Sequence, residues 1–316
     1  MSALGRTSVS ETRTHRSGDE DLIVRPRRHY GRLLASTVVI ILGVYVLISV
    51  ATNERFGWGV VGDYLFDGAI LAGLRSTLLL TLYSTLIGLG LGALIAIMRL
   101  SPIRVLSVPA WLFALFFRGT PLLVQIIFWY NLAALYPTVS LGPFYEGSVN
   151  ELITPITAGL LALGLNEAAY LSEIIRAGII GIDKGQTEAA KSLGMRPFRV
   201  LRRVVFPQAM RTIVPPTGNE VIGLLKSTAL VSVIAVPELL FSAQVIYAQN
   251  LETIPLLVVV SIWYIVVTTV MSVGQYYLER HYGRGSGRET PRNFLQVLGT
   301  SLTRSHAPRP PEGAPA

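Results

Sequence analysis

Six long hydrophobic blocks, separated by polar loops, dominate the pattern of the chain. A helix needs about 20 apolar residues to cross about 30 Å of hydrocarbon, and each block is near or above that length. The pattern therefore predicts an all-α membrane protein with about six transmembrane helices. The blocks lie near residues 33–50, 74–98, 119–136, 154–179, 209–226 and 255–278.

The first block is compatible with either a signal peptide or an uncleaved anchor, because it follows a basic flank at residues 25–32. Its long apolar core and extended polar arm favour the anchor. The next segment, residues 54–70, places aromatic side chains among acidic and glycine residues. That composition is typical of an interfacial segment at the outer headgroups.

These features predict four regions. The two ends are rich in Arg, Ser, Gly and Pro and lack hydrophobic periodicity, so we expect disordered tails there. The regions are a tail at 1–30, an amino-terminal membrane anchor with its interfacial segment at 31–72, a transmembrane domain at 73–282, and a tail at 283–316.

Two details within the blocks predict local structure. Gly88 and Gly92 form a small-xxx-small face, which lets another helix approach closely. Residues 103–117 are expected to lie along the inner surface, and Arg118 then begins the turn into the third block, because a charge is costly at greater depth.

Composition supports the membrane interpretation. Hydrophobic residues make up 51% of the 316 positions and charged residues only 15%, which is outside the usual soluble range. The net charge of +8 is compatible with nucleic-acid binding, but no zinc-finger, helix-turn-helix or RNA-binding signature accompanies it. We therefore expect contact with membrane lipid and none with nucleic acid.

The basic residues predict the orientation, because cytoplasmic flanks retain Lys and Arg. A basic run occupies 184–211, whereas loops 137–153 and 248–254 contain no Lys or Arg. Placing the basic run inside puts both termini in the cytoplasm. We therefore expect a multi-pass membrane protein.

The cytoplasmic loop at 183–207 is predicted to contain two short helices. Asp183 and Gln186 have the spacing of a capping box, so the first helix should begin near Lys184. Gly194 should end it, because glycine readily takes the left-handed conformation that closes a helix.

The second helix of this loop should begin at Pro197, which suits a first turn. Three arginines fall on one of its faces and aliphatic residues on another. Pro207 is expected to end or kink it. The result is a two-helix projection between the fourth and fifth blocks.

The same loop carries a recognisable pattern. Glu188, Ala189 and Ala190 are followed after three residues by Gly194, and after nine more by an aliphatic-x-hydrophobic-Pro ending at Pro207. This resembles the EAA motif of bacterial ABC importer permeases, with Val and Phe where Ile and Leu are usual. Other stretches resemble the polar amino-acid branch of that family; they are 117–132, 166–179, 185–195, 207–234 and 272–285.

The resemblance, which covers roughly residues 68–285, implies a type I ABC importer permease fold with a cytoplasmic coupling helix, in the bacterial plasma (inner) membrane. It implies a pathway for polar amino acids, and three kinds of partner: a second permease subunit, identical or homologous, two ABC ATPase subunits and an extracytoplasmic amino-acid-binding protein. It also implies coupling roles, with Glu188 as a polar contact, Ala189 and Ala190 as small residues that permit close approach, and Gly194 as the turn.

The chain lacks the residues for chemistry of its own. No GxxxxGK[ST] phosphate loop occurs, so we expect no cofactor in this chain and ATP bound by the partner ATPase. The four His lie at positions 15, 29, 281 and 306, without metal-ligand spacing. We therefore expect neither a metal site nor an enzyme.

Ionisable residues inside spans are costly and mark pathways. Glu167, Glu220, Lys226 and Thr228 are the candidates for the substrate pathway, with packing against a second permease as the alternative for the last three. The stretch 209–247 exceeds one crossing and should break after Thr228. Glu173 and the Arg three residues later have ion-pair spacing.

A different function remains open at this point. A stand-alone secondary transporter or channel, driven by an ion gradient, would also be a multi-span protein. It predicts inverted repeats and unpaired acidic residues at mid-membrane. No convincing internal repeat is visible in the sequence, and such a protein has no use for a projecting cytoplasmic loop.

Overall fold

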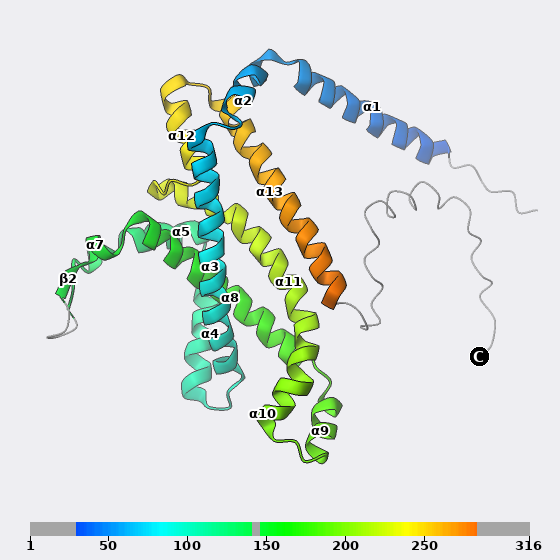
Figure 1. Cartoon of the computed structure of the whole chain (residues 1–316), viewed down its shortest axis with the longest axis vertical. Helices are drawn as coiled ribbons and strands as arrows, with labels where there is room; N and C mark the ends of the chain where they lie inside the picture. The colour runs from blue at the N-terminus through cyan, green and yellow to red at the C-terminus, as the bar shows by residue number, and fades with distance from the viewer. Residues whose placement is uncertain (1–29, 141–145, 283–316) are drawn as a thin grey trace, which may run out of the picture. The chain divides into compact units, whose positions relative to one another are not determined.

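The computed structural model describes residues 30–140 and 146–282, and helices dominate both ranges (Figure 1). Contacts divide the chain into two units, Met1–Asn53 and Glu54–Ala316. The first contains helix α1 (Tyr30–Thr52), whose described side chains are exposed or half-buried. The expected tails at 1–30 and 283–316 lie outside the described residues, except for Tyr30.

Four described helices are long and apolar enough to cross a membrane: α1, α3 (Gly68–Leu100), α8 (Pro155–Ile180) and α13 (Thr253–Tyr282). Two bent pairs raise the number to six if each is one span. This confirms the expected all-α membrane protein with about six spans. The pairs are α4 (Arg104–Gly119) with α5 (Leu122–Tyr130), and the helical run Pro197–Ile234 with α12 (Leu239–Asn250).

The remaining elements are short except for α11. Strands β1 and β2 form an antiparallel pair with Thr138 opposite Ser148. The elements are η1 (Glu54–Phe56), α2 (Trp58–Tyr64), α6 (Leu132–Leu135), β1 (Thr138–Ser140), β2 (Glu146–Ser148), α7 (Val149–Leu152), α9 (Lys184–Ser192), α10 (Pro197–Val200), the π-helix η3 (Leu201–Val205), α11 (Phe206–Ser227) and the 3-10 helix η4 (Thr228–Ile234).

Helices α3 and α8 pack closely along their lengths. A Cβ atom added to Gly92 would lie 3.0 Å from the backbone oxygen of Ala168, and one on Gly88 would lie 2.5 Å from Cγ of Glu167. Side chains larger than hydrogen would therefore separate the two helices. The close packing predicted for the two glycines is confirmed.

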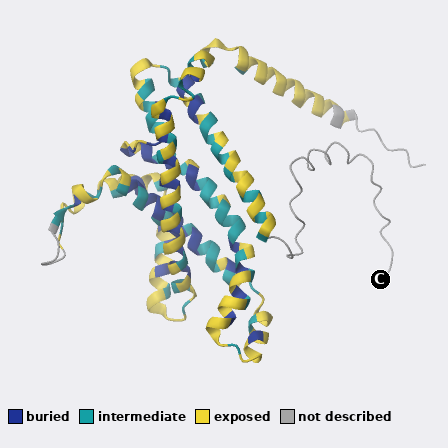
Figure 2. Ribbon diagram, in the orientation of Figure 1, coloured by how far each residue is buried: buried dark blue, intermediate teal, exposed yellow. Residues whose placement is uncertain are grey.

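The main core lies where α3, α5, α8, α11 and η4 meet, around Leu80, Ile126, Leu163, Leu224 and Val231. Exposed residues cover much of the outer surface of the helices (Figure 2), and many of them are large apolar residues. This distribution is that of a protein whose solvent is largely hydrocarbon, since lipid does not exclude apolar groups.

A second core joins α2 to α3, α12 and α13. Val61 of α2 is buried with Ile70, Leu239 and Leu256. Residues 54–72 therefore belong with the transmembrane unit, whereas the sequence grouped them with the anchor. The sequence could not indicate this, because the partners of α2 in α12 and α13 lie more than 170 positions further along the chain.

The turn predicted to begin at Arg118 is present, because α4 and α5 are bent by 104° from each other between Gly119 and Leu122. Beyond this turn the third block is not one continuous helix, since α5 ends at Tyr130 and α6 begins at Leu132. Nor is 103–117 simply a surface helix, since α4 buries Ala110, Ala114 and Phe117 against its neighbours. At the bend, Gln125 Nε2 donates to the Phe117 oxygen at 2.9 Å and Asn166 Nδ2 donates to the same oxygen at 2.8 Å. These bonds satisfy a carbonyl that the helix end leaves open.

Candidate functional site

The 183–207 segment projects at one end of the helices (Figure 1). Helix α9 begins at Lys184, as predicted, and Asp183 Oδ1 accepts a hydrogen bond from the Gly185 amide at 2.8 Å. This carboxylate satisfies one of the amides that a helix start leaves open.

Gly194 forms the turn that follows α9. Its φ is +76°, in the left-handed region. The Gly194 amide donates to the Lys191 oxygen at 2.9 Å, and the Met195 amide donates to the Ala190 oxygen at 3.2 Å. These two bonds define a Schellman motif, in which glycine avoids the steric cost of a Cβ. The predicted helix end is confirmed.

A small apolar cluster holds the two helices of the segment together. Ala190, Val200 and Val205 are buried, and Met195 packs against them. Ala190 is only 5% exposed, so its small side chain lets the two helices of the segment approach each other. This differs from the expectation that Ala190 would make room for a partner.

The outer surface of the segment is a mixture of charged and apolar groups. Glu188 and Ala189 are both exposed on α9. Leu193 is 83% exposed and Phe198 is 73% exposed. Exposed apolar side chains on a polar projection are typical of a protein contact. The sequence analysis did not identify Leu193 and Phe198 as contact residues. The signal that could have found them is an apolar residue near a helix end within a polar loop.

Pro207 does not end the second helix. The backbone stays helical from Pro197 to Ser227, and Pro207 lies in the first turn of α11. Directly before it, the Phe206 amide donates to the oxygen of Leu201, five residues earlier. The wider π turn gives the proline ring room where a regular α-helix would place a clashing carbonyl.

Two of the predicted pathway residues come together. Glu167 of α8 is 4% exposed, and its Oε1 has no hydrogen-bond partner among the described residues. It interacts electrostatically with Glu220 of α11, and Glu220 does so with Arg118 of α4. Glu220 is half-buried. The result is a pair of carboxyl groups between two long helices.

The other two pathway candidates differ from each other in exposure. Lys226 is exposed in the last turn of α11. Thr228 is fully buried, and its Oγ1 donates to the Leu225 oxygen at 2.6 Å. The predicted break after Thr228 is confirmed, because the backbone changes there to a 3-10 helix that ends at Ile234 and is followed by Ala235 with φ +58°.

Glu238 is a buried polar residue that sequence reasoning missed. It caps α12, and its carboxyl oxygens accept from the amides of Leu240 at 3.0 Å and Phe241 at 2.7 Å. The hydroxyls of Thr77 and Tyr264 also reach it, at 3.5 Å and 3.3 Å. A Glu directly before an apolar helix was the signal that could have identified the cap.

A cluster of arginines surrounds Glu173 on α8. Arg99 and Arg176 form close ion pairs with its carboxylate, and Arg118 lies 3.8 Å away. The ion pair predicted from the spacing within α8 is therefore confirmed. The structure adds the two arginines from α3 and α4.

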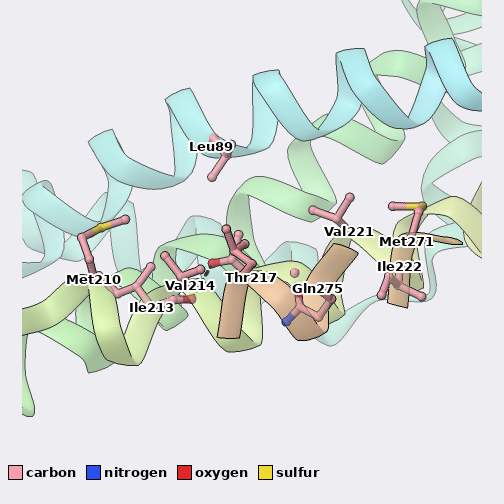
Figure 3. Close-up of a pocket in the computed structure, with 11 residues that line it drawn as sticks. Leu89, Met210, Ile213, Val214, Thr217, Val221, Ile222, Met271 and Gln275 are labelled. Atoms are coloured by element: carbon pink, nitrogen blue, oxygen red, sulfur yellow. Dashed lines mark hydrogen bonds between the residues drawn. The ribbon is translucent and has the colours of Figure 1, made fainter. Parts of the chain in front are cut away.

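A cavity of 390 Å³ lies between α3, α11 and α13 (Figure 3). Met210, Val214 and Val221 line it from α11, and Leu89 faces them from α3. Its lining is almost entirely apolar, and Gln275 Nε2 donates to the Pro215 oxygen at 2.7 Å. None of the predicted pathway residues lines this cavity.

Over residues 30–140 and 146–282, no group of three His, Cys, Asp or Glu side chains could hold a metal ion. The functional candidates in the described structure are therefore the projecting segment and the polar groups between helices.

Comparison with known proteins identifies the family. Residues 88–284 match the model of the binding-protein-dependent transport system inner membrane component. The chain is 44% identical to the arginine transport system permease protein ArgU of Corynebacterium glutamicum, over 87% of each chain. It is 37% identical to the nopaline transport system permease protein NocM of Agrobacterium fabrum, over 71% of this chain and 93% of that protein.

A solved structure shares the fold. A crystal structure described as an amino acid ABC transporter with histidines superposes with a TM-score of 0.61, at 37% identity, over 67% of this chain and 94% of that chain. The described helices therefore have the type I ABC importer permease fold. The comparisons favour a subunit of such an importer over a stand-alone transporter or channel. This chain belongs to the binding-protein-dependent transport system inner membrane components, the permease subunits of ABC importers.

Proposed function

We propose that this chain forms the translocation pathway of an ATP-driven importer of polar amino acids and is moved by a separate ATPase through the 183–207 segment. The observation that carries the proposal is the construction of that segment. An internal core around Ala190 makes it rigid, and Leu193 and Phe198 expose apolar surface at its tip. A rigid projection can transmit the closure of an ATPase pair as a rigid-body movement between two states.

The proposed partners supply functions that this chain lacks. Without a phosphate loop it needs two ABC ATPase subunits, which bind the ATP, and it performs no chemistry itself. A second permease subunit completes the pathway, and an extracytoplasmic binding protein delivers substrate. The positive-inside rule places both termini and the 183–207 segment in the cytoplasm. In this arrangement Glu188 and Ala189 contact the ATPase.

For the substrate, we propose amino acids with a basic side chain. The 44% identical relative is named for arginine, and Glu167 and Glu220 supply carboxyl groups between α8 and α11. A buried carboxyl oxygen without a partner is costly unless a cation meets it. Lys226 and Thr228 are proposed to line the same pathway beyond this pair.

The proposed function is tested by reconstituting the permease with its ATPase in liposomes. We expect uptake of labelled arginine that requires ATP on the side of the liposome membrane that carries the ATPase. Uptake should also require the binding protein on the opposite side. A panel of neutral and acidic amino acids measures selectivity. Uptake that follows a sodium or proton gradient without ATP would contradict the proposal and support a stand-alone transporter.

Replacing Glu167 with glutamine is expected to raise the KM for arginine about tenfold while changing uptake of a neutral amino acid much less. The amide keeps the size of the side chain but carries no negative charge, so it cannot form an ion pair with a cation. The exposed Glu54→Gln is the matched control. An equal loss for basic and neutral substrates would show that Glu167 serves helix packing instead.

A further inference from the structure

Three arginines from three helices share one carboxylate. Glu173 Oε2 faces Arg99 of α3 and Arg118 of α4, and its Oε1 faces Arg176 of α8. Each guanidinium carries five donors, whereas a carboxylate offers about four acceptor positions. The Nε of Arg176 is buried without a partner in the described residues. The cluster therefore has more donors than Glu173 can satisfy.

The cluster also has excess positive charge. Glu220 interacts with Arg118, so three arginines face two glutamates. The side chain of Arg99 is 13% exposed and that of Arg176 is 29% exposed. Partial burial makes an uncompensated charge costly, because little water reaches it. An anion at this place would complete the charge balance.

A pocket of 270 Å³ opens beside this cluster. Arg99 lines it from α3, and the stripe Trp111, Ala114, Leu115, Arg118 lines it from α4, together with Gly119. The spacing of the stripe puts these side chains on one helix face. Trp111 is 50% exposed and Leu115 is 54% exposed. The pocket thus combines two guanidinium groups with an apolar, aromatic rim.

The apolar rim continues along α4 beyond the pocket. Val108, Leu112 and Phe116 are about half exposed, at 49%, 50% and 57%. An occupant that joins an anionic group to hydrocarbon chains fits this surface, whereas a free ion uses only the arginines. Tryptophan is enriched at the level of lipid headgroups, and basic pockets between transmembrane helices bind anionic headgroups.

We propose that the pocket lined by Arg99, Arg118 and Trp111 binds the phosphate of an anionic phospholipid. The guanidinium groups donate paired hydrogen bonds to the phosphate oxygens, a geometry that arginine favours. Trp111 and Leu115 contact the glycerol and the start of the acyl chains. The bound lipid bridges α3 and α4 through Arg99 and Arg118, because Glu173 cannot accept hydrogen bonds from all the donors of these two arginines. This site does not depend on the proposed substrate.

The test uses the full chain in detergent. Native mass spectrometry and thermal unfolding are measured with phosphatidylglycerol, with phosphatidylcholine, and with inorganic phosphate alone. We expect phosphatidylglycerol to remain bound and to raise the unfolding midpoint, and the other two additions to do neither. Equal effects of the two lipids would overturn the proposal. Protection by inorganic phosphate alone would also overturn it, since a free anion would then be the ligand.

Two variants locate the site. Leu115→Glu adds a negative charge at the rim without removing any partner of Glu173, and it should weaken phosphatidylglycerol binding at least tenfold. Leu94→Glu is the matched control, because Leu94 on α3 is as exposed as Leu115, at 53%, but lies outside the pocket lining and the α4 rim. It should bind as the wild type does. Equal losses in both variants would mean that the added charge acts through the membrane surface and would overturn the assignment.

Discussion

Replacing Gly194 with valine is expected to reduce ATP-dependent uptake at least tenfold while the permease remains folded in the membrane. At φ +76° a residue with a Cβ costs about 1–2 kcal/mol, and a β-branched residue is a stronger outlier. The Schellman bonds of Gly194 and Met195 would then break. Since about 1.4 kcal/mol is a factor of ten, the loss of this turn is sufficient to displace α9 from α10.

Two further variants give this prediction its controls. Gly194→Asn should retain most of the uptake, because asparagine tolerates the left-handed region. Gly90→Val makes the same change on α3, where nothing beyond the local helix backbone lies within 4 Å of the added Cβ, and should also retain it. The readouts are uptake in liposomes and the yield of ATPase that co-purifies. Equal uptake by the valine and asparagine variants at position 194 would refute the role of the turn.

The parts of the 183–207 segment that sequence predicted are those controlled by local bonds. The Asp183 cap and the Gly194 turn involve partners within five residues. Such signals are complete within a short stretch of sequence. For the same reason the start and end of α9 were predicted correctly.

The parts that sequence did not predict depend on contacts that no short stretch contains. Ala190 faces inward because Val200 and Val205 cover it from the second helix. Pro207 continues a helix because a π turn precedes it. A rule that assigns proline to helix ends is based on regular α geometry, so it fails where the turn is wider.

Long-range partners explain the remaining differences. Glu167 and Glu220 lie more than 50 positions apart, and only the crossing of α8 and α11 brings them together. Glu173 gained Arg99 and Arg118 in the same way. Sequence could identify each of these residues as unusual inside an apolar span, but it could not pair them. The paired carboxyl groups and the arginine cluster are thus properties of the helix packing.

The strongest effect on stability is expected at Glu238. Its carboxyl joins three elements, since it caps α12 and accepts from Thr77 of α3 and Tyr264 of α13. It is completely buried, so no water can replace it. The Thr77 hydroxyl also accepts from the Leu239 amide at 3.1 Å. Removing the carboxyl therefore disturbs a network and not a single bond.

Replacing Glu238 with alanine is expected to lower the free energy of unfolding by about 2–6 kcal/mol, because the amides of Leu240 and Phe241 lose their acceptor inside the protein at about 1–3 kcal/mol each. Glu238→Gln keeps one acceptor oxygen and should recover part of the loss. The exposed Glu54→Ala is the matched control. Unfolding in detergent, followed by circular dichroism, measures all three. If the alanine variants at 238 and 54 unfold alike, the network does not hold α12 against α3 and α13.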